Sequence, residues 1–212
     1  MLIGIPVFEN VETLDVSGPY DMFRWAGFDV ELTAAKPGLV TFYKGYKFQV
    51  DVAFADAAQH YHALWVPGGE TKSVSREIND PKQTYLNFVK AKAKNAGVIA
   101  SVCEGSLLLA AAGLLDGYTA TTHWSCINCF KERFPKVTAA QGFPRYVLDE
   151  RPGSSPRLTG GGISSGLDAA LKLIEILSDK QTAQKVQINT QYYPDPPVTS
   201  KIPEPLPQCG LS

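Results

Sequence analysis

Cys103 lies between a short apolar run and an Ala- and Leu-rich segment, and this setting offers the clearest chemistry in the chain. The apolar run, residues 98–102, is typical of a strand buried on both faces of a parallel sheet, and residues 104–112 are predicted to form a helix. A nucleophile on a sharp strand-to-helix turn needs small residues two positions before and after it, because larger side chains would collide with the neighbouring elements. Ser101 and Gly105 meet that requirement. The pattern therefore predicts a nucleophile elbow that carries a catalytic thiol.

The surroundings predicted for Cys103 bear on its reactivity. The thiolate is the reactive form of cysteine, and N–H groups at the start of a helix stabilise it. We therefore expect the pKa of Cys103 to fall below the ~8.5 of a free thiol. The alternative is a buried, inert cysteine at the end of a core strand, and the small residues on both sides of Cys103 favour the catalytic interpretation.

Pro67-Gly68-Gly69 ends another predicted core strand, residues 62–66. In an open parallel sheet, the carboxyl ends of adjacent strands border the ligand crevice. Two glycines there allow bare backbone to approach a ligand, and the N–H groups of Gly68 and Gly69 could stabilise developing negative charge. Taken alone, the same tripeptide is equally consistent with a turn that only ends the strand.

His123 follows a third predicted strand, residues 118–122, and is expected at the same edge of the sheet. A cysteine nucleophile commonly uses histidine as a base or as a cationic partner. A structural histidine is the competing interpretation. His123 also has metal-like spacing to Cys126 and Cys129, but no second cluster completes four ligands and the segment is predicted to be helical. We therefore expect no metal.

Asp15 begins a predicted helix, residues 14–25, directly after the first strand. Its residue type alone indicates an N-cap or a first-turn acid. The run Gly160-Gly161-Gly162 precedes another predicted helix, residues 165–177, and suits an anion. It lacks the spacing of a dinucleotide or phosphate-binding fingerprint, so no nucleotide cofactor is predicted.

Strand-like and helix-like segments alternate along the chain, as in βαβ units that build a parallel sheet. This pattern predicts an α/β protein with a mainly parallel sheet and helices on both faces. An antiparallel excursion is expected over residues 40–52, and a strand pair over 146–149 and 157–159. One domain is predicted over residues 1–193. Residues 194–212 hold six of the fifteen prolines and are predicted to form an extended C-terminal arm, which either frays or lies across a neighbouring surface.

The composition argues against several classes of protein. Twenty Lys and Arg against twenty-one Asp and Glu give a net charge of −1, and no basic run marks a nucleic-acid surface. The longest apolar stretch, residues 107–115, is too short to cross a bilayer, so no membrane partner is expected. The N-terminus lacks a secretory signal, and four cysteines are too few and too irregular for a disulfide framework. We therefore expect a reducing, cytoplasmic location.

Together, these motifs resemble the ThiJ/PfpI superfamily, which shares its fold with class I glutamine amidotransferases, and within it the isonitrile hydratases. The resemblance covers nearly the whole chain to about Pro197. The matching segments are Leu14-Asp15-Val16-Ser17-Gly18-Pro19, Trp65-Val66-Pro67-Gly68-Gly69, Ser101-Val102-Cys103, Ala110-Ala111-Ala112-Gly113-Leu114-Leu115-Asp116-Gly117-Tyr118, Ala120-Thr121-Thr122-His123-Trp124, Thr159-Gly160-Gly161-Gly162-Ile163 and Ala183-Gln184-Lys185-Val186-Gln187.

The resemblance implies a flavodoxin-like sandwich, a homodimer, and a small-molecule substrate without metal or organic cofactors. It places an acid at the position of Asp15 beside the nucleophile, which overturns the N-cap interpretation. The implied reaction is attack by Cys103 on the terminal carbon of an isonitrile to give a thioimidate, with Asp15 donating and accepting protons. Hydrolysis would then release an N-substituted formamide.

Glu104 departs from the pattern of the resembling families. Isonitrile hydratases generally carry Thr directly after the nucleophile, and PfpI-type proteases carry His there. A second carboxylate near the thiol raises the pKa of the thiol if both acids are ionised. We therefore expect Glu104 to point away or one carboxyl to stay protonated, with Asp15 sharing a proton with Cys103. Glu104 is itself a candidate for proton transfer or substrate binding, and protease activity is disfavoured.

Two other functions fit the same residues. The first is a glyoxalase- or deglycase-like activity, in which Cys103 forms a hemithioacetal with a reactive aldehyde and a nearby acid moves the proton. The second is a redox sensor or stress-response protein, whose thiol oxidises to a sulfinic acid. Turnover of an isonitrile, turnover of methylglyoxal, and stable oxidation without turnover distinguish the three.

Overall fold

A seven-stranded sheet forms the centre of the molecule. The computed structural model describes residues 1–211, and in it the strands lie in the order β10-β11-β7-β6-β1-β2-β5. All neighbours are parallel except β10 and β11, which form the predicted strand pair and run antiparallel. The strands are β1 (Leu2–Pro6), β2 (Asp29–Ala34), β5 (Val52–Ala53), β6 (Ala63–Val66), β7 (Val98–Ser101), β10 (Tyr146–Asp149) and β11 (Arg157–Gly160).

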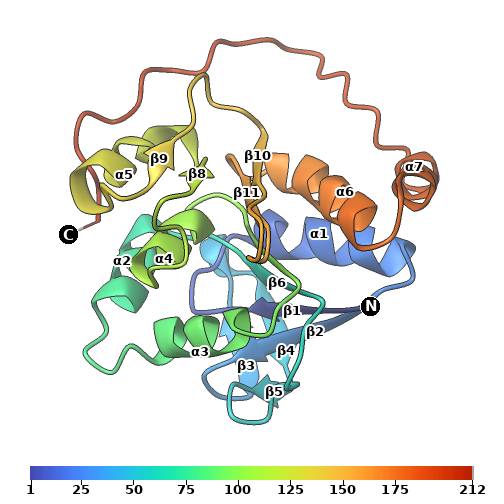
Figure 1. The fold of residues 1–212 in the computed structure, drawn as a ribbon, viewed down its shortest axis with the longest axis horizontal. Coiled ribbons are helices and arrows are strands. Elements are labelled where there is room, and N and C mark those ends of the chain that lie inside the picture. The colour runs from blue at the N-terminus through green and yellow to red at the C-terminus, as the bar shows by residue number, and fades with distance from the viewer. Residues whose placement is uncertain (212) are drawn as a thin grey trace.

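Helices cover both faces of this sheet, which confirms the predicted α/β class and its flavodoxin-like sandwich. Figure 1 shows α1, α6 and α7 on one face and α2, α3 and α4 on the other, with α5 at the end near α4. The helices are α1 (Thr13–Trp25), α2 (Thr71–Asn79), α3 (Thr84–Ala93), α4 (Gly105–Ala111), α5 (Asn128–Arg133), α6 (Ser165–Leu177) and α7 (Lys180–Asn189).

Two small sheets flank the main one. β3 (Gly38–Thr41) and β4 (Lys47–Val50) form the predicted antiparallel excursion around the 3-10 turn η1 (Tyr43–Gly45). β8 (Thr119–Ala120) and β9 (Thr138–Ala139) form a short parallel pair. The chain after β8 continues into the 3-10 turn η2 (Trp124–Cys126) and then α5, so the single helix expected there is divided in two.

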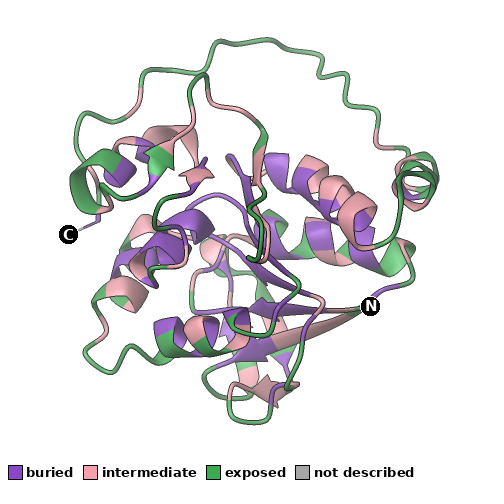
Figure 2. Ribbon diagram, viewed as in Figure 1, coloured by how far each residue is buried: buried purple, intermediate pink, exposed green. Residues whose placement is uncertain are grey.

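The core is built around the central strands. β6 and β7 are buried along their whole length, which is why their sequences are continuous apolar runs without alternation. Trp65 is fully buried and packs edge-on against Phe23 of α1. Figure 2 shows this buried centre and an exposed C-terminal arm. The carboxyl ends of β6 and β7 lie side by side and carry the predicted site residues.

Helix α2 has no counterpart in the sequence prediction. Its segment, Thr71–Asn79, is mostly polar, and Val74 is its only buried apolar side chain. The apolar periodicity that identifies an amphipathic helix is therefore too sparse to mark it.

The arm after α7 contains no helix or strand between residues 194 and 211. It arches from α7 across the molecule to α5 (Figure 1). There the Leu206 N–H donates to the carbonyl oxygen of Ser125 at 3.3 Å, and Asn128 Nδ2 donates to the Leu206 carbonyl at 2.9 Å. The end of the arm is therefore anchored on η2 and α5.

A disulfide joins Cys129 of α5 to Cys209 of the arm. The expectation of unpaired cysteines is wrong for this pair, because the arm returns over 80 residues of sequence to meet α5, and spacing alone does not reveal such a contact. Cys103 and Cys126 are free and buried. A cytoplasmic location loses the support of unpaired cysteines and stays a prediction.

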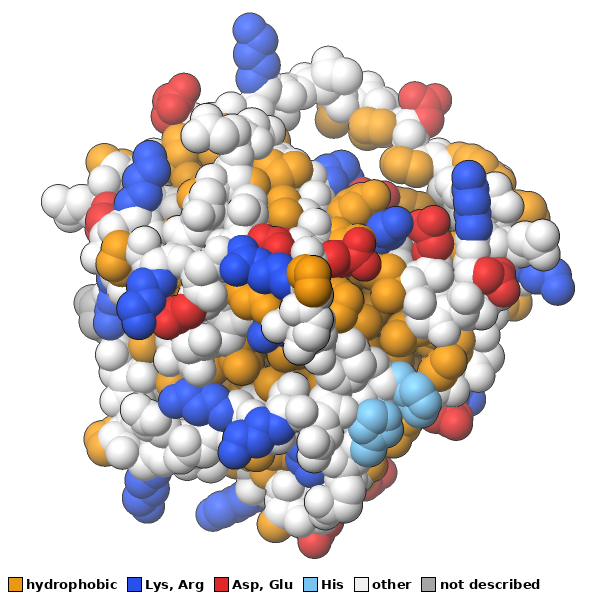
Figure 3. All heavy atoms as spheres, viewed as in Figure 1, with side chains coloured by type: hydrophobic (Ala, Val, Ile, Leu, Met, Phe, Trp, Pro, Cys, Tyr) orange, Lys and Arg blue, Asp and Glu red, His pale blue; other side chains and the backbone are white. Residues whose placement is uncertain are grey.

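Charges are mixed on the surface. On the face drawn in Figure 3, Lys and Arg side chains are interspersed with Asp and Glu side chains, so this face presents no continuous field of one sign. None of the helices in the described part of the chain combines the length and apolar character that a bilayer crossing requires.

Candidate active site

Cys103 occupies the turn between β7 and α4 with a φ of 55°, in the left-handed region that residues other than glycine rarely adopt. Such a conformation costs on the order of 1–2 kcal/mol and persists only where the surroundings enforce it. The packing around Gly105 shows how closely the turn is surrounded, because a Cβ built on that glycine would lie 2.0 Å from the carbonyl oxygen of Val66. The turn is thus as tight as the predicted elbow requires.

Neighbouring loops hold the elbow by its backbone. The Cys103 N–H donates to the carbonyl oxygen of Gly161 at 2.8 Å, and its own carbonyl accepts a hydrogen bond from Thr122 Oγ1 at 2.9 Å. Ser106 Oγ donates to the same carbonyl at 3.1 Å. The strained turn is therefore held by the loops that follow β11 and β8 and by α4.

Asp15 lies in the first turn of α1 and is completely buried. Its Oδ2 accepts the Gly68 N–H at 2.9 Å, while Oδ1 makes no hydrogen bond within residues 1–211. Burial raises the pKa of Asp15 well above its usual range; the Gly68 hydrogen bond opposes this, and the charge of Glu104 adds to it. Asp15 therefore stays protonated at a pH at which an exposed aspartate is ionised.

Gly68 packs against both the acid and the nucleophile, whose side chains are within hydrogen-bonding reach of each other, and leaves no room for a side chain of its own. A Cβ on Gly68 would lie 2.9 Å from Cys103 Cβ, 3.1 Å from Asp15 Oδ2 and 2.6 Å from Glu104 N. In this geometry the N–H of Gly68 is bound to Asp15, and its role in stabilising developing charge stays a prediction. Gly69 lines the cavity in front of the thiol, and its oxyanion role stays a prediction.

Glu104 turns towards the sulfur. Cys103 Sγ donates to Glu104 Oε2 at 2.7 Å, and Cys126 Sγ donates to Oε1 of the same carboxylate at 3.5 Å. The expectation that Glu104 points away from the sulfur is therefore wrong. The other expected arrangement, in which one of the two carboxyl groups stays protonated, remains. Burial and the Glu104 charge raise the pKa of Cys126 to about 12.

The electrostatics of the site keep Cys103 protonated at rest. Burial raises the pKa of Cys103 well above its usual value, and the negative charges that Asp15 and Glu104 carry when ionised raise it further. A hydrogen bond from the backbone of Ile163 acts in the opposite direction. The expected lowering of the pKa by helix dipoles is wrong, because α4 has only seven residues and the sulfur is buried between two acids.

His123 lies beside the cavity as the N-cap of η2. Its Nδ1 forms a 2.7 Å hydrogen bond with Ser125 Oγ, and its ring packs so closely on Gly162 that a Cβ there would lie 2.5 Å from Cδ2. The contact made by its ring nitrogen is thus with Ser125, whereas the acceptor of the Cys103 thiol is Glu104. A direct catalytic role for His123 stays a prediction.

Three further residues of the site carry no strong sequence signal of their own. Thr122 binds the elbow carbonyl, Ile163 directs a backbone N–H at the thiol, and Cys126 shares the carboxylate of Glu104. For Ile163, the preceding glycine run is the available sequence signal, because a loop without side chains allows its backbone to approach a neighbouring group such as the thiol.

A cavity of about 420 Å³ opens in front of the thiol. Cys103 borders it although only 2 % of the residue's surface is exposed, so a small ligand can reach the sulfur while bulk water has little access. Its walls carry three glutamates and one lysine. The lining residues are Glu12, Tyr43, Gly69, Glu70, Thr71, Lys72, Cys103, Glu104, His123, Ser125 and Ile163.

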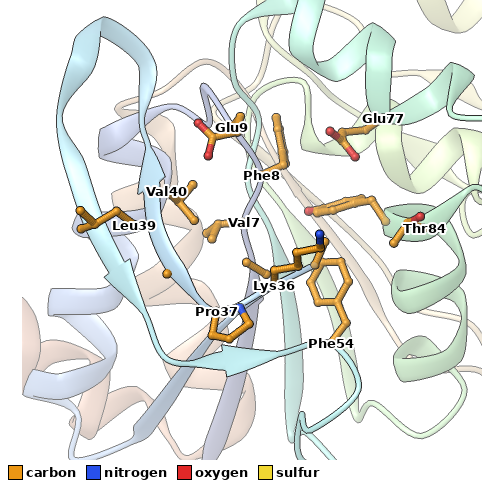
Figure 4. A pocket seen from close by; sticks show the side chains of 14 residues that line it. Val7, Phe8, Glu9, Lys36, Pro37, Leu39, Val40, Phe54, Glu77 and Thr84 are labelled. Carbon is orange, nitrogen blue, oxygen red and sulfur yellow. The ribbon is translucent and has the colours of Figure 1, made fainter.

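A second cavity, of about 330 Å³, lies beyond the carboxyl ends of β1 and β2. Figure 4 shows apolar side chains such as Val7, Phe54 and Val40 in its walls, with Glu9 and Glu77 near one end. It has no cysteine or histidine among its lining residues and shares none of them with the catalytic cavity. The residues predicted to carry chemistry therefore line the cavity at Cys103 and not this second one.

The fold and site define an α/β sandwich with a cysteine at a strand-to-helix elbow, and comparison with known proteins assigns its family. The chain belongs to the DJ-1/PfpI family, whose model matches residues 1–175. It is 36 % identical over 209 residues to the isonitrile hydratase of Pseudomonas putida, covering 98 % of this chain and 85 % of that protein.

Two further relatives show the breadth of the family. A ThiJ/PfpI family protein from Pseudomonas syringae superposes with a TM-score of 0.83 at 32 % identity, covering 93 % of this chain and 77 % of that one. The HTH-type transcriptional regulator CdhR of Pseudomonas aeruginosa is 34 % identical over 184 residues, which is 86 % of this chain and about half (49 %) of the regulator. The family thus contains both enzymes and regulators.

Proposed function

We propose that this protein adds water to small isonitriles and releases N-substituted formamides, with Cys103 as the nucleophile. The observation that carries the proposal is the 2.7 Å contact of Cys103 Sγ with Glu104 Oε2 at the wall of a cavity, with the buried Asp15 close behind the elbow. The similarity to an isonitrile hydratase along 98 % of the chain supports it.

The first half of the reaction forms the covalent intermediate. As Cys103 Sγ bonds to the terminal carbon of R–N≡C, its proton passes to the Glu104 carboxylate, the acceptor already in place. Asp15, kept protonated by burial, gives its proton to the same carbon. The product is a thioimidate, R–N=CH–S–Cys103, with Glu104 now protonated and Asp15 ionised.

The second half hydrolyses that intermediate. Water attacks the thioimidate carbon and gives a proton to Asp15, while Glu104 returns its proton to the nitrogen. The C–S bond of R–NH–CH(OH)–S–Cys103 then breaks, and the hydroxyl proton moves to the leaving sulfur through Glu104. The formamide R–NH–CHO leaves, and all three side chains recover their starting protonation states.

The test is incubation of the purified protein with cyclohexyl isocyanide, with N-cyclohexylformamide quantified by chromatography. We expect turnover in the wild type and none in Cys103→Ala, with both proteins shown to be folded by thermal melting. Absence of formamide with the folded wild type would refute the proposal, as would undiminished turnover in Cys103→Ala. Parallel incubation with methylglyoxal measures the glyoxalase- or deglycase-like alternative, and turnover of that substrate alone would replace the hydratase assignment.

We also infer that two copies associate, as the resemblance implies. Support comes from an apolar depression between α1 and the β3–β4 hairpin, next to the exposed aromatic ring of Tyr46. Light scattering should give twice the 23.0 kDa of one chain, and a mass of one chain would contradict the dimer. A cytoplasmic location is part of the same proposal and is tested by cell fractionation.

A further inference from the structure

A cluster of three metal-ligating side chains lies on one wall of the catalytic cavity. Glu104, His123 and Cys126 each offer one ligand atom, and these atoms all lie within 4.8 Å of one another. We propose that this cluster binds a thiophilic divalent cation, with Zn²⁺ as the best match.

The fold assembles the cluster from two short segments. Glu104 directly follows the nucleophile as the N-cap of α4. His123 is the N-cap of the single turn η2, and Cys126 is the last residue of that turn. The three residues with metal-like spacing in the sequence, His123, Cys126 and Cys129, are therefore not the three that form the cluster. Cys129 is committed to the disulfide with Cys209, and Glu104 takes its place.

The separation of the cysteine sulfur and the carboxylate oxygen fits a tetrahedral ion. Zn–S and Zn–O bonds of about 2.3 and 2.0 Å place a sulfur and an oxygen ligand about 3.5 Å apart on a tetrahedron. Cys126 Sγ and Glu104 Oε1 are separated by 3.5 Å. Three protein ligands leave a fourth position for water, and both His123 and Glu104 border the cavity through which an ion and water enter.

Ser125 supports the ligands from outside the cluster. Its Oγ lies 2.7 Å from His123 Nδ1 and 3.5 Å from Cys126 Sγ. Hydrogen bonds of this kind orient the ligating side chains of metal sites.

The charges of the site also favour a cation. One thiolate and one carboxylate balance the charge of a divalent ion, and Glu12 and Glu70 outweigh Lys72 elsewhere on the cavity wall. A thiolate and an imidazole select zinc and related ions over Mg²⁺ and Ca²⁺, which prefer oxygen ligands.

Metal binding at this position has a consequence that rests on the proposed function. The Glu104 carboxylate that accepts the Cys103 proton would become a metal ligand, so it could no longer serve the nucleophile. Zn²⁺ is therefore expected to inhibit turnover, not to support it.

The direct test is a titration with Co²⁺, which reports thiolate ligands through a charge-transfer band and tetrahedral geometry through its visible bands. The protein used is Cys103→Ala, in which Cys126 is the one remaining free thiol because Cys129 and Cys209 are paired. We expect both bands in Cys103→Ala, their loss in Cys103→Ala with Cys126→Ser, and at least tenfold weaker binding in Cys103→Ala with His123→Ala.

The outcome that overturns the site is equally defined. If Cys103→Ala shows no thiolate band while Cys126→Ser retains one, the metal uses the nucleophile and the proposed cluster is wrong. If the band survives in the variant lacking both thiols, it does not report this site at all. Neither result depends on isonitrile turnover, so failure of the metal site and failure of the proposed function are distinguishable.

A second measurement uses activity. Micromolar Zn²⁺ should inhibit the wild type reversibly, with recovery on addition of a chelator. It should inhibit Cys126→Ser at least tenfold less, when the turnover of each protein is expressed relative to its own turnover without metal. Equal inhibition of the wild type and Cys126→Ser would show that the ion acts elsewhere and would refute the inhibitory role.

Discussion

Around Cys103, two acids contact the thiol from different positions. Asp15 is fully buried and keeps its proton, whereas Glu104 accepts the hydrogen bond of the sulfur. The thiol therefore stays protonated at rest, and in the proposed reaction the carboxylate that raises its pKa is also the base that removes its proton. Reactivity then depends on a proton acceptor at short range and not on a preformed thiolate.

Glu104→Gln tests the two effects of this carboxylate, because the substitution should increase the rate of Cys103 alkylation and decrease the rate of isonitrile turnover. Loss of the negative charge lowers the pKa of Cys103, so alkylation by iodoacetamide at pH 8 should become about tenfold faster. Loss of the base should reduce isonitrile turnover by about 100-fold. Both rates are measured in a Cys126→Ser background, which removes the second free thiol. A parallel change of both rates would contradict the assigned role.

Asp15 predicts a dependence of stability on pH. Its pKa is raised in the folded state, so its stabilising contribution is full below the unfolded pKa of about 3.9 and is lost as pH rises through the folded value. Between these two pKa values, the free energy of unfolding falls by at most about 1.4 kcal/mol for each unit of pH. The asparagine side chain of Asp15→Asn cannot ionise. The free energy of unfolding of this variant, relative to that of the wild type, should therefore increase between pH 5 and pH 8. Urea unfolding at both pH values measures the gap, and a constant gap would show that Asp15 is ionised in the folded protein.

Among the elements, the elbow depends on close contact between α4 and β6. Gly105→Ala places a Cβ 2.0 Å from the Val66 carbonyl oxygen, and backbone on both sides leaves little room for relief. We expect a loss of about 3 kcal/mol in the free energy of unfolding, measured in urea. Gly113→Ala is the matched control at the other end of α4, where φ is +73° but no atom lies within 4 Å. It should cost only about 1 kcal/mol, and equal losses would mean that the predicted clash is absent.

The elements also show what could be predicted from sequence. Strong apolar patterns identified β7 and α6 with nearly their observed bounds, and the small residues around Cys103 identified the elbow. Helix α2 was missed because few of its residues are apolar. The positions of Glu104 relative to the sulfur, and of Ile163 beside it, depend on how distant loops pack, and local patterns do not contain that information.

In the molecule as a whole, the C-terminal arm connects parts of the fold that no strand or helix joins. The disulfide between Cys129 and Cys209 encloses α6 and α7, and the backbone of Leu206 contacts η2 next to the catalytic cavity. The arm thus ties the segment that carries His123 and Cys126 to the opposite side of the molecule. Prolines predicted its extended form, and its attachment is a tertiary contact that composition did not reveal.

Cys209→Ser should therefore lower the free energy of unfolding, mainly because the unfolded chain gains conformational entropy when the loop is opened. Opening a loop of 80 residues removes up to about 4.5 kcal/mol from the free energy of unfolding in the loop-entropy model. Cys126→Ser, which breaks no disulfide, is the control and should lose far less. Limited proteolysis gives a second measurement, because cleavage between residues 194 and 208 should become faster in Cys209→Ser and in reduced wild type. If neither stability nor proteolysis differs from the control, the hydrogen bonds of Leu206 and Asn128 hold the arm without the disulfide.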